Sequence, residues 1–235
     1  MRASKIPEER LYVVPFQTKE YGRSAGAVLR STRVLTAVAL LCAMCAVIDV
    51  FFIPVGGPFL RISFSFLIAA VLCQIGGPAY ALPAGFLVDL LSFLIGGGDP
   101  AGYFPGYALS SMLAFLIYAL FLFRTRLSLL RLFLCKLTVN FGINVILGSV
   151  WKHMLYGKAY SFYFVSGAVK NLGMLPVETA LMAMVFTALL PILRKTELIP
   201  LETGLRSHKW EIPVCIFAAV IGVIGLILYY RWTHP

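Results

Sequence analysis

The chain contains too few charged residues for an ordinary soluble domain. Only 13% of its 235 residues are charged, whereas 60% are hydrophobic. Soluble domains carry about 25% charged residues, so this composition favours a lipid environment. The sequence also contains no glycine-rich nucleotide loop ending in lysine. It therefore predicts no ATP hydrolysis by this chain alone, and any active transport would need another subunit.

Histidine is scarce, and the common catalytic motifs are missing. The three histidines, His153, His208 and His234, are far apart in sequence, and neither H-E-x-x-H nor G-x-S-x-G occurs. A membrane-embedded enzyme would need a clustered catalytic set. The sequence therefore favours a non-enzymatic protein.

Cysteine is present but sparse, and all five cysteines lie in apolar segments. Cys42 and Cys45 have C-x-x-C spacing, but no second pair and no nearby histidine accompanies them. We interpret these side chains as small buried apolar groups. The sequence predicts no disulfide, metal or cofactor site.

Long apolar runs dominate what remains. A helix needs roughly 20 apolar residues to cross a bilayer, and Gly-Pro pairs separate the early runs because both residues end helices. The runs predict helices over residues 34–54, 62–76, 79–95, 106–123, 127–151, 166–193 and 212–230. We expect an all-α integral membrane protein: a polar arm (1–33), a six-helix domain (34–195), a linker (196–210) and an additional helix with a short tail (211–235). The two longest outer loops are expected at 96–105 and 152–165.

Lysine and arginine occur in alternate loops, which explains the net charge of +10 without invoking nucleic acid. They cluster before the first run, between the fourth and fifth, and after the sixth. The positive-inside rule then predicts a cytoplasmic N-terminus and an outer C-terminus. The basic arm is a topology signal and a potential contact for anionic lipid. It lacks the pattern of a cleaved signal peptide, so we expect the first helix to remain.

Four charges inside or near the predicted spans are the first candidates for function, because a charge in the hydrocarbon region is costly. Asp89 and Glu178 are each able to accept hydrogen bonds from the edge of a flat heterocycle, or to hold helices together through a lysine or an asparagine. Lys170 is placed either to snorkel to the surface or to neutralise an anionic ligand. Asp49 is expected at the interface.

Three further polar residues accompany them. Asn140 and Asn144 are four apart and share a helix face, where they link helices or contact a ligand. Arg61, at the outer start of the second run, is placed for bidentate capture of a carboxylate.

Several segments, read together, resemble the folate-type substrate-binding subunits (S-components) of energy-coupling factor (ECF) vitamin transporters. They are Leu60-Arg61-Ile62-Ser63-Phe64, Gly76-Gly77-Pro78 with Gly85 and Asp89, Phe104-Pro105-Gly106-Tyr107-Ala108-Leu109-Ser110, Val139-Asn140 to Trp151, and Lys170-Asn171-Leu172-Gly173-Met174-Leu175-Pro176-Val177-Glu178. The resemblance covers roughly residues 34–195.

The resemblance implies a six-helix S-component that binds one vitamin near the outer face. Its partners would be a transmembrane coupling subunit and two ATPases, with Ala39 and Ala43 forming the helical face that docks on the coupling subunit. It also implies ligand-binding positions at Arg61, Ser63, Phe64, Asp89, Phe104, Asn140, Asn144, Lys170 and Glu178.

Two features depart from that family. The chain continues into a seventh helix, and residues 165–169 lack the arginine that often precedes the position of Lys170, so another pterin or vitamin remains an alternative ligand. A second interpretation is a membrane scaffold of the cell-shape type, in which the buried charges only pair. A formed outer pocket lined by the charges would favour the transporter, and a solid bundle the scaffold.

Overall fold

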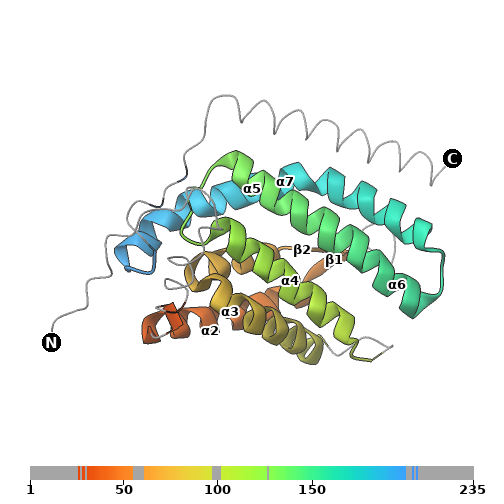
Figure 1. Cartoon of the computed structure of the whole chain (residues 1–235), viewed down its shortest axis with the longest axis horizontal. Helices are drawn as coiled ribbons and strands as arrows, with labels where there is room; N and C mark the ends of the chain where they lie inside the picture. Colours follow the sequence, from red (N-terminus) through yellow and green to blue (C-terminus); the bar gives the residue numbers. More distant parts are fainter. Residues whose placement is uncertain are drawn as a thin grey trace.

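The computed structural model describes residues 26, 28–29, 31–54, 61–96, 102–125, 127–199, 203 and 205. Nearly all of them are helical (Figure 1). The elements are α2 (Thr32–Val50), β1 (Phe52–Pro54), β2 (Arg61–Ser63), α3 (Ser65–Ile95), α4 (Pro105–Leu122), α5 (Leu129–Thr138), the π-helix η1 (Val139–Leu147), α6 (Gly148–Tyr156) and α7 (Tyr160–Lys195).

Five helical segments in the described part of the chain are long and apolar enough to cross a membrane. They are Thr32–Val50, Ser65–Ile95, Pro105–Leu122, Leu129–Tyr156 and Tyr160–Lys195, with α5, η1 and α6 forming the fourth without a break. Length and apolar character are what a bilayer core requires of a spanning helix. The chain is therefore a helical, multi-pass membrane protein. The predicted helix over 212–230 lies outside the described residues.

The long helix α3 reverses direction within its length. Straight, its 31 residues would extend about 46 Å. Yet Cys45 of α2 donates a hydrogen bond to the Ser65 carbonyl (3.4 Å), and Ser92 donates to the carbonyl of the adjacent Ala46 (3.4 Å). Both ends of α3 thus touch the same turn of α2. The reversal lies at Gly77, whose φ of 65° and ψ of −168° are non-helical and accessible to glycine.

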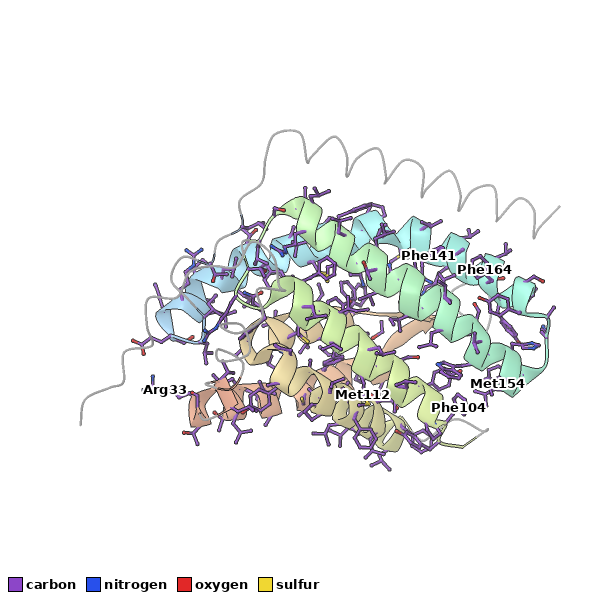
Figure 2. All side chains as sticks on the ribbon, in the orientation of Figure 1. Arg33, Phe104, Met112, Phe141, Met154 and Phe164 are labelled. Carbon is purple, nitrogen blue, oxygen red and sulfur yellow. The ribbon has the colours of Figure 1, made fainter. Side chains whose placement is uncertain are left out.

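The bundle has a basic end, defined by Arg33, Arg124, Arg131, Arg194 and Lys195. Arg33, at the start of α2, forms an ion pair with Glu197, just after α7 (3.5 Å). Figure 2 shows Arg33 at one end of the bundle and Phe104, before α4, at the other. The reversal also lies at the basic end, because a Cβ on Gly77 would meet the ring of Phe123, just after α4.

A short β-hairpin interrupts an otherwise helical structure and corrects two predicted helix boundaries. The first helix was expected to reach residue 54 and the second to begin at 62, but α2 ends at Val50 and α3 begins at Ser65. Between them β1 and β2 pair antiparallel, with Phe52 opposite Ser63 and Pro54 opposite Arg61. Pro54 lacks the amide hydrogen that a continued helix needs. Pairing of the two strands supplies hydrogen-bond partners for backbone N–H and C=O groups that lie beyond the end of the helix.

The predicted outer loop over 152–165 is also wrong. Helix α6 continues to Tyr156 and α7 begins at Tyr160, which leaves only residues 157–159 as a connection. The prediction rested on a fall in hydropathy and on aromatic content. These mark where a helix leaves the hydrocarbon region, because aromatic residues gather at the interface, and helices commonly continue past it.

The first residues of the predicted polar linker pack against the bundle. Ile199 is 5% exposed and Thr203 is fully buried. Arg194 donates from both Nε (2.6 Å) and Nη2 to the Thr203 carbonyl, and a parallel bridge joins Leu127 to Leu205. The folded unit at the basic end therefore extends beyond residue 195.

Candidate functional site

A cavity of about 580 Å³ lies among α2, α3, α4, α7 and the α5–η1–α6 segment. It reaches from the end of the bundle opposite the basic end, where Gly102 and Lys152 line it, down to Lys136 and Glu178. Small-molecule sites typically have volumes of about 300–1,000 Å³. The bundle is therefore hollow, and the cavity has room for a ligand.

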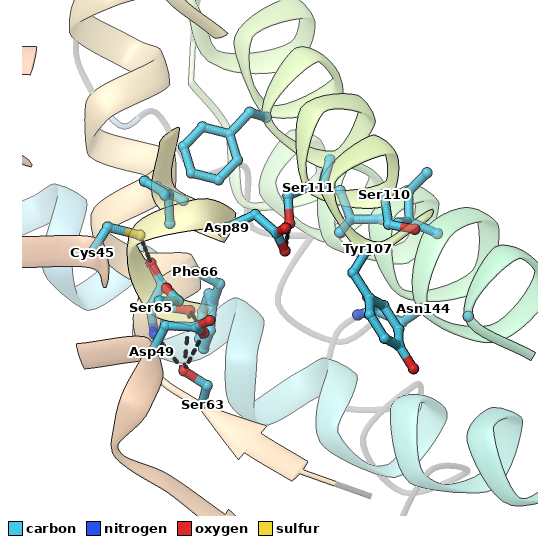
Figure 3. Close-up of a pocket in the computed structure, with 18 of the residues that line it drawn as sticks. Cys45, Asp49, Ser63, Ser65, Phe66, Asp89, Tyr107, Ser110, Ser111 and Asn144 are labelled. Atoms are coloured by element: carbon cyan, nitrogen blue, oxygen red, sulfur yellow. Dashed lines mark hydrogen bonds between the residues drawn. The ribbon is translucent and has the colours of Figure 1, made fainter. Parts of the chain in front are cut away.

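Two carboxylates line one wall of the cavity (Figure 3). Asp49, near the end of α2, accepts hydrogen bonds from the hydroxyls of Ser63 (3.0 Å) and Ser65 (2.7 Å), which tie the hairpin to α2. Asp89 of α3 accepts a longer bond from Ser111 of α4 (3.4 Å). Asp89 retains acceptor capacity, because a carboxylate has about four acceptor positions.

Tyr103 lies beside Asp89 in the loop before α4. Burial and the neighbouring carboxylate of Asp89 raise the pKa of the Tyr103 hydroxyl. The hydroxyl therefore stays protonated at neutral pH and remains a potential donor.

The floor of the cavity, toward the basic end, holds a buried ion pair. The Lys136 ammonium of α5 lies 3.1 Å from Oε2 of Glu178 in α7, and both residues are buried. Lys136 also donates to the Tyr118 hydroxyl (3.3 Å), and its nitrogen lies 3.9 Å from the centre of the Phe66 ring. A buried charge is tolerated when it is paired and hydrogen-bonded, as here.

Asparagines extend this network along η1 and α7. Asn140 donates to Glu178 Oε2 (2.6 Å), and Asn144 donates to the side-chain oxygen of Asn140 (3.2 Å). Asn144 also donates weakly to Asn171 (3.5 Å), which in turn donates to the Gly167 carbonyl (2.8 Å). The predicted pairing of the two asparagines on one face holds, although the segment is a π-helix.

Aromatic side chains surround the opposite, upper part of the cavity. The ring of Phe104 packs edge-to-face against Tyr107 (5.6 Å between centroids) and Trp151 (5.5 Å). Trp151 donates from its indole nitrogen to the Ser110 hydroxyl (2.9 Å), and Ser110 lines the cavity. Two lysines, Lys152 and Lys170, add positive charge to the lining. The cavity thus combines carboxylates, amides, cations and aromatic rings, which suits a flat molecule with polar groups at both ends.

The chain resembles known folate transporters in sequence. It is 31% identical over 128 residues to the folate transporter FolT of Clostridium novyi, a match that covers 54% of this chain and 73% of that protein. The chain belongs to the FolT family of folate transporters.

Further comparisons agree with membership of the FolT family. The FolT of Leuconostoc mesenteroides is 26% identical over 156 residues, covering 64% of this chain and 82% of that protein. A crystal structure of FolT bound with folic acid superposes with a TM-score of 0.59 at 28% identity, covering 65% of this chain and 92% of the other. No protein-family model matches the chain. The predicted relationship to folate S-components is confirmed.

Most of the residues that the FolT-like motifs predicted for the ligand site lie around one cavity. Ser63, Asp89, Phe104, Asn144, Lys170 and Glu178 all line it. Asn140 reaches it through Glu178. Phe64 is not in the lining and is 41% exposed, because it caps α3 on the outside of the bundle. Arg61 begins β2, and its side chain lies outside the described part of the structure.

Sequence reasoning did not place several important residues in the cavity. Phe66, Tyr118 and Lys136 form its floor, and Asp49, expected at the interface, belongs to its wall. Lys136 could have been predicted from the sequence, because it lies inside the predicted span 127–151. A charged residue within a predicted span is the criterion that selected Lys170. Phe66 and Tyr118 had no distinguishing signal among the 18 phenylalanines and 11 tyrosines of the chain.

Proposed function

We propose that this protein is the substrate-binding subunit of an ECF-type importer and that it binds folate in the central cavity. The observation that carries the proposal is the cavity itself, in which charges, amides and aromatic rings from helices far apart in sequence converge. Kinship with FolT proteins supports folate as the ligand. The open bundle argues against the scaffold interpretation, in which the same charges would only pair.

Folate has a flat pterin with a hydrogen-bonding edge, an aromatic linker and an acidic glutamate tail. Carboxylates in the cavity, Asp89 or Glu178, would accept from the pterin edge. Lys170 or Arg61 would bind the tail carboxylates. Phe104, close to Trp151, supplies an aromatic wall for the linker.

The proposed topology has six crossings in the core. The two arms of α3, on either side of Gly77, count as separate crossings because both ends of α3 contact α2. The segment before Gly77 is short for a full crossing, and the hairpin of β1 and β2 completes it on the outer side. The basic end then faces the cytoplasm together with the N-terminus, as the positive-inside rule requires.

The proposed partners are a transmembrane coupling subunit and two ATPases. Ala39 and Ala43 lie one turn apart on α2, and both are exposed on the outside of the bundle. Large apolar side chains beside them are exposed as well, including Leu40 (64%) and Met44 (45%). Small residues permit close approach of a second helix, so this face suits docking within the bilayer.

The experiment is to purify the protein in detergent and titrate folic acid while recording tryptophan fluorescence. Trp151 should be quenched because it contacts Phe104 at the cavity. Replacing Trp210 and Trp232 with phenylalanine assigns the signal to Trp151. Saturable binding near one ligand per protein supports the proposal, and binding of another pterin or vitamin in place of folate would change the substrate. A protein that binds none of them would contradict it.

The tail assignment is tested separately with Lys170→Gln and Arg61→Gln. Loss of a charge-assisted contact should weaken binding of folic acid about tenfold or more in at least one of them. Lys195→Gln is the matched control, since Lys195 is exposed at the basic end. Unchanged affinity in both variants would show that the tail lies elsewhere.

A further inference from the structure

The ion pair at the cavity floor is formed through one of the two carboxylate oxygens of Glu178. Two neighbours of Glu178, the ammonium of Lys136 and the amide of Asn140, contact the same oxygen, Oε2, and the charge of Lys170 also acts on Glu178. Both of these contacts leave Oε1 to other partners, and Glu178 lines the cavity. One carboxylate oxygen is therefore held in place by the protein while the other remains available to a ligand.

Hydrogen-bond donors lie directly beside this free acceptor. The Lys136 ammonium and the Tyr118 hydroxyl both line the cavity. Because Tyr118 accepts a hydrogen bond from Lys136 (3.3 Å), that bond does not use the proton of the Tyr118 hydroxyl, which can be donated to a ligand. The Phe66 ring, 3.9 Å from the Lys136 nitrogen, supplies a flat apolar surface next to them. The floor thus presents an acceptor, a donor and an aromatic surface together.

We propose that Lys136 is a specificity-determining residue, which together with Glu178 recognises the pyrimidinone edge of the ligand's pterin. Glu178 Oε1 accepts from the ring N–H and amino group, while Lys136, directly or through Tyr118, donates to the neighbouring ring carbonyl. This inference rests on the proposed function, because it takes folate as the ligand. It places the pterin at the floor and leaves the tail beside the lysines nearer the mouth.

This pairing predicts which close analogue the site rejects. In aminopterin an amino group replaces the ring carbonyl of folic acid, so a donor stands where Lys136 and Tyr118 require an acceptor. The adjacent ring nitrogen also loses its hydrogen, so Glu178 loses one donor. A site built to hydrogen-bond one group rejects an analogue that leaves its buried polar groups unpaired. Asp89 differs, since its described neighbours are the neutral hydroxyls of Ser111 and Tyr103. A pterin bound at Asp89 would not meet a lysine that disfavours the amino group.

The test is a calorimetric titration of the purified full-length protein with folic acid and with aminopterin. The variants are Lys136→Gln, the doubly neutral Lys136→Gln/Glu178→Gln, Asp89→Asn and the inert control Lys195→Gln. The double variant guards against misfolding of Lys136→Gln, because it leaves no unpaired buried charge. We expect the unmodified protein and Lys195→Gln to prefer folic acid by about tenfold or more.

The ratio of the two affinities decides the outcome. We expect the preference to fall in Lys136→Gln and, because Glu178 also loses its charge there, to fall further in the double variant, while Asp89→Asn keeps it. Equal binding of both ligands by the unmodified protein would overturn the inference and leave the proposed function intact. So would a preference that is undiminished in both Lys136 variants or disappears in Asp89→Asn. If the unmodified protein does not bind folic acid at all, the proposed function fails first.

Discussion

Substitution of Gly77 should disrupt the reversal of α3. The residue has φ of 65° and ψ of −168°, a region that other residues enter at a cost of about 1–3 kcal/mol. A Cβ there would also lie 2.7 Å from two ring atoms of Phe123, which is 1% exposed. Overpacking of this kind costs about 1–3 kcal/mol. The two effects together predict that Gly77→Ala lowers the unfolding free energy by about 2–6 kcal/mol.

The assay is thermal unfolding in detergent, followed by the fraction of protein that stays monodisperse in gel filtration. A loss of this size should lower Tm by about 5 °C or more. Gly142→Ala is the matched control, because a Cβ on Gly142 meets nothing within 4 Å. Its Tm should stay level or rise slightly, since alanine favours helix over glycine. If Gly77→Ala has the same Tm as Gly142→Ala, the reversal of α3 does not depend on glycine and the reasoning is wrong.

Three other outcomes follow from contacts elsewhere in the bundle. Gly85→Val should reduce the yield of folded protein, because even a Cβ at Gly85 would lie 2.7 Å from the Cα of Met112 and separate α3 from α4; a normal melting curve would contradict this. Arg194→Met should cost about 1–3 kcal/mol by removing the donors to the Thr203 carbonyl, measured as a fall in Tm. Trp151→Phe should abolish most of the folate-dependent quenching while binding, measured by calorimetry, persists.

Several features of the fold followed from the sequence because they depend on local composition. Apolar runs of sufficient length predicted the spans, since lipid admits only backbone that is hydrogen-bonded within itself. The predicted helix over 106–123 differs by one residue at each end from the observed Pro105–Leu122. Gly76-Gly77-Pro78 indicated a break between two spans, and the structure places the reversal there.

Boundaries outside the hydrocarbon region were less predictable. Hydropathy falls where a helix meets the interface, although the hydrogen-bond ladder continues, so the predicted loop over 152–165 is largely helical. The hairpin between α2 and α3 depends on pairing between residues seven to eleven apart in sequence, as well as on the two serine hydroxyls that bind Asp49. Neither contact has a local sequence signature.

The sequence by itself determined that this is a membrane protein, how its apolar segments are spaced, and which family it resembles. Those properties depend on each segment's own transfer into lipid and on ordered motifs. Only the tertiary structure decided how the charges pair. Glu178 meets Lys136 across 42 residues of chain and leaves one oxygen facing a cavity. Such a juxtaposition depends on how α5 and α7 pack, because a buried charge is stabilised by whatever partner the packing brings within reach.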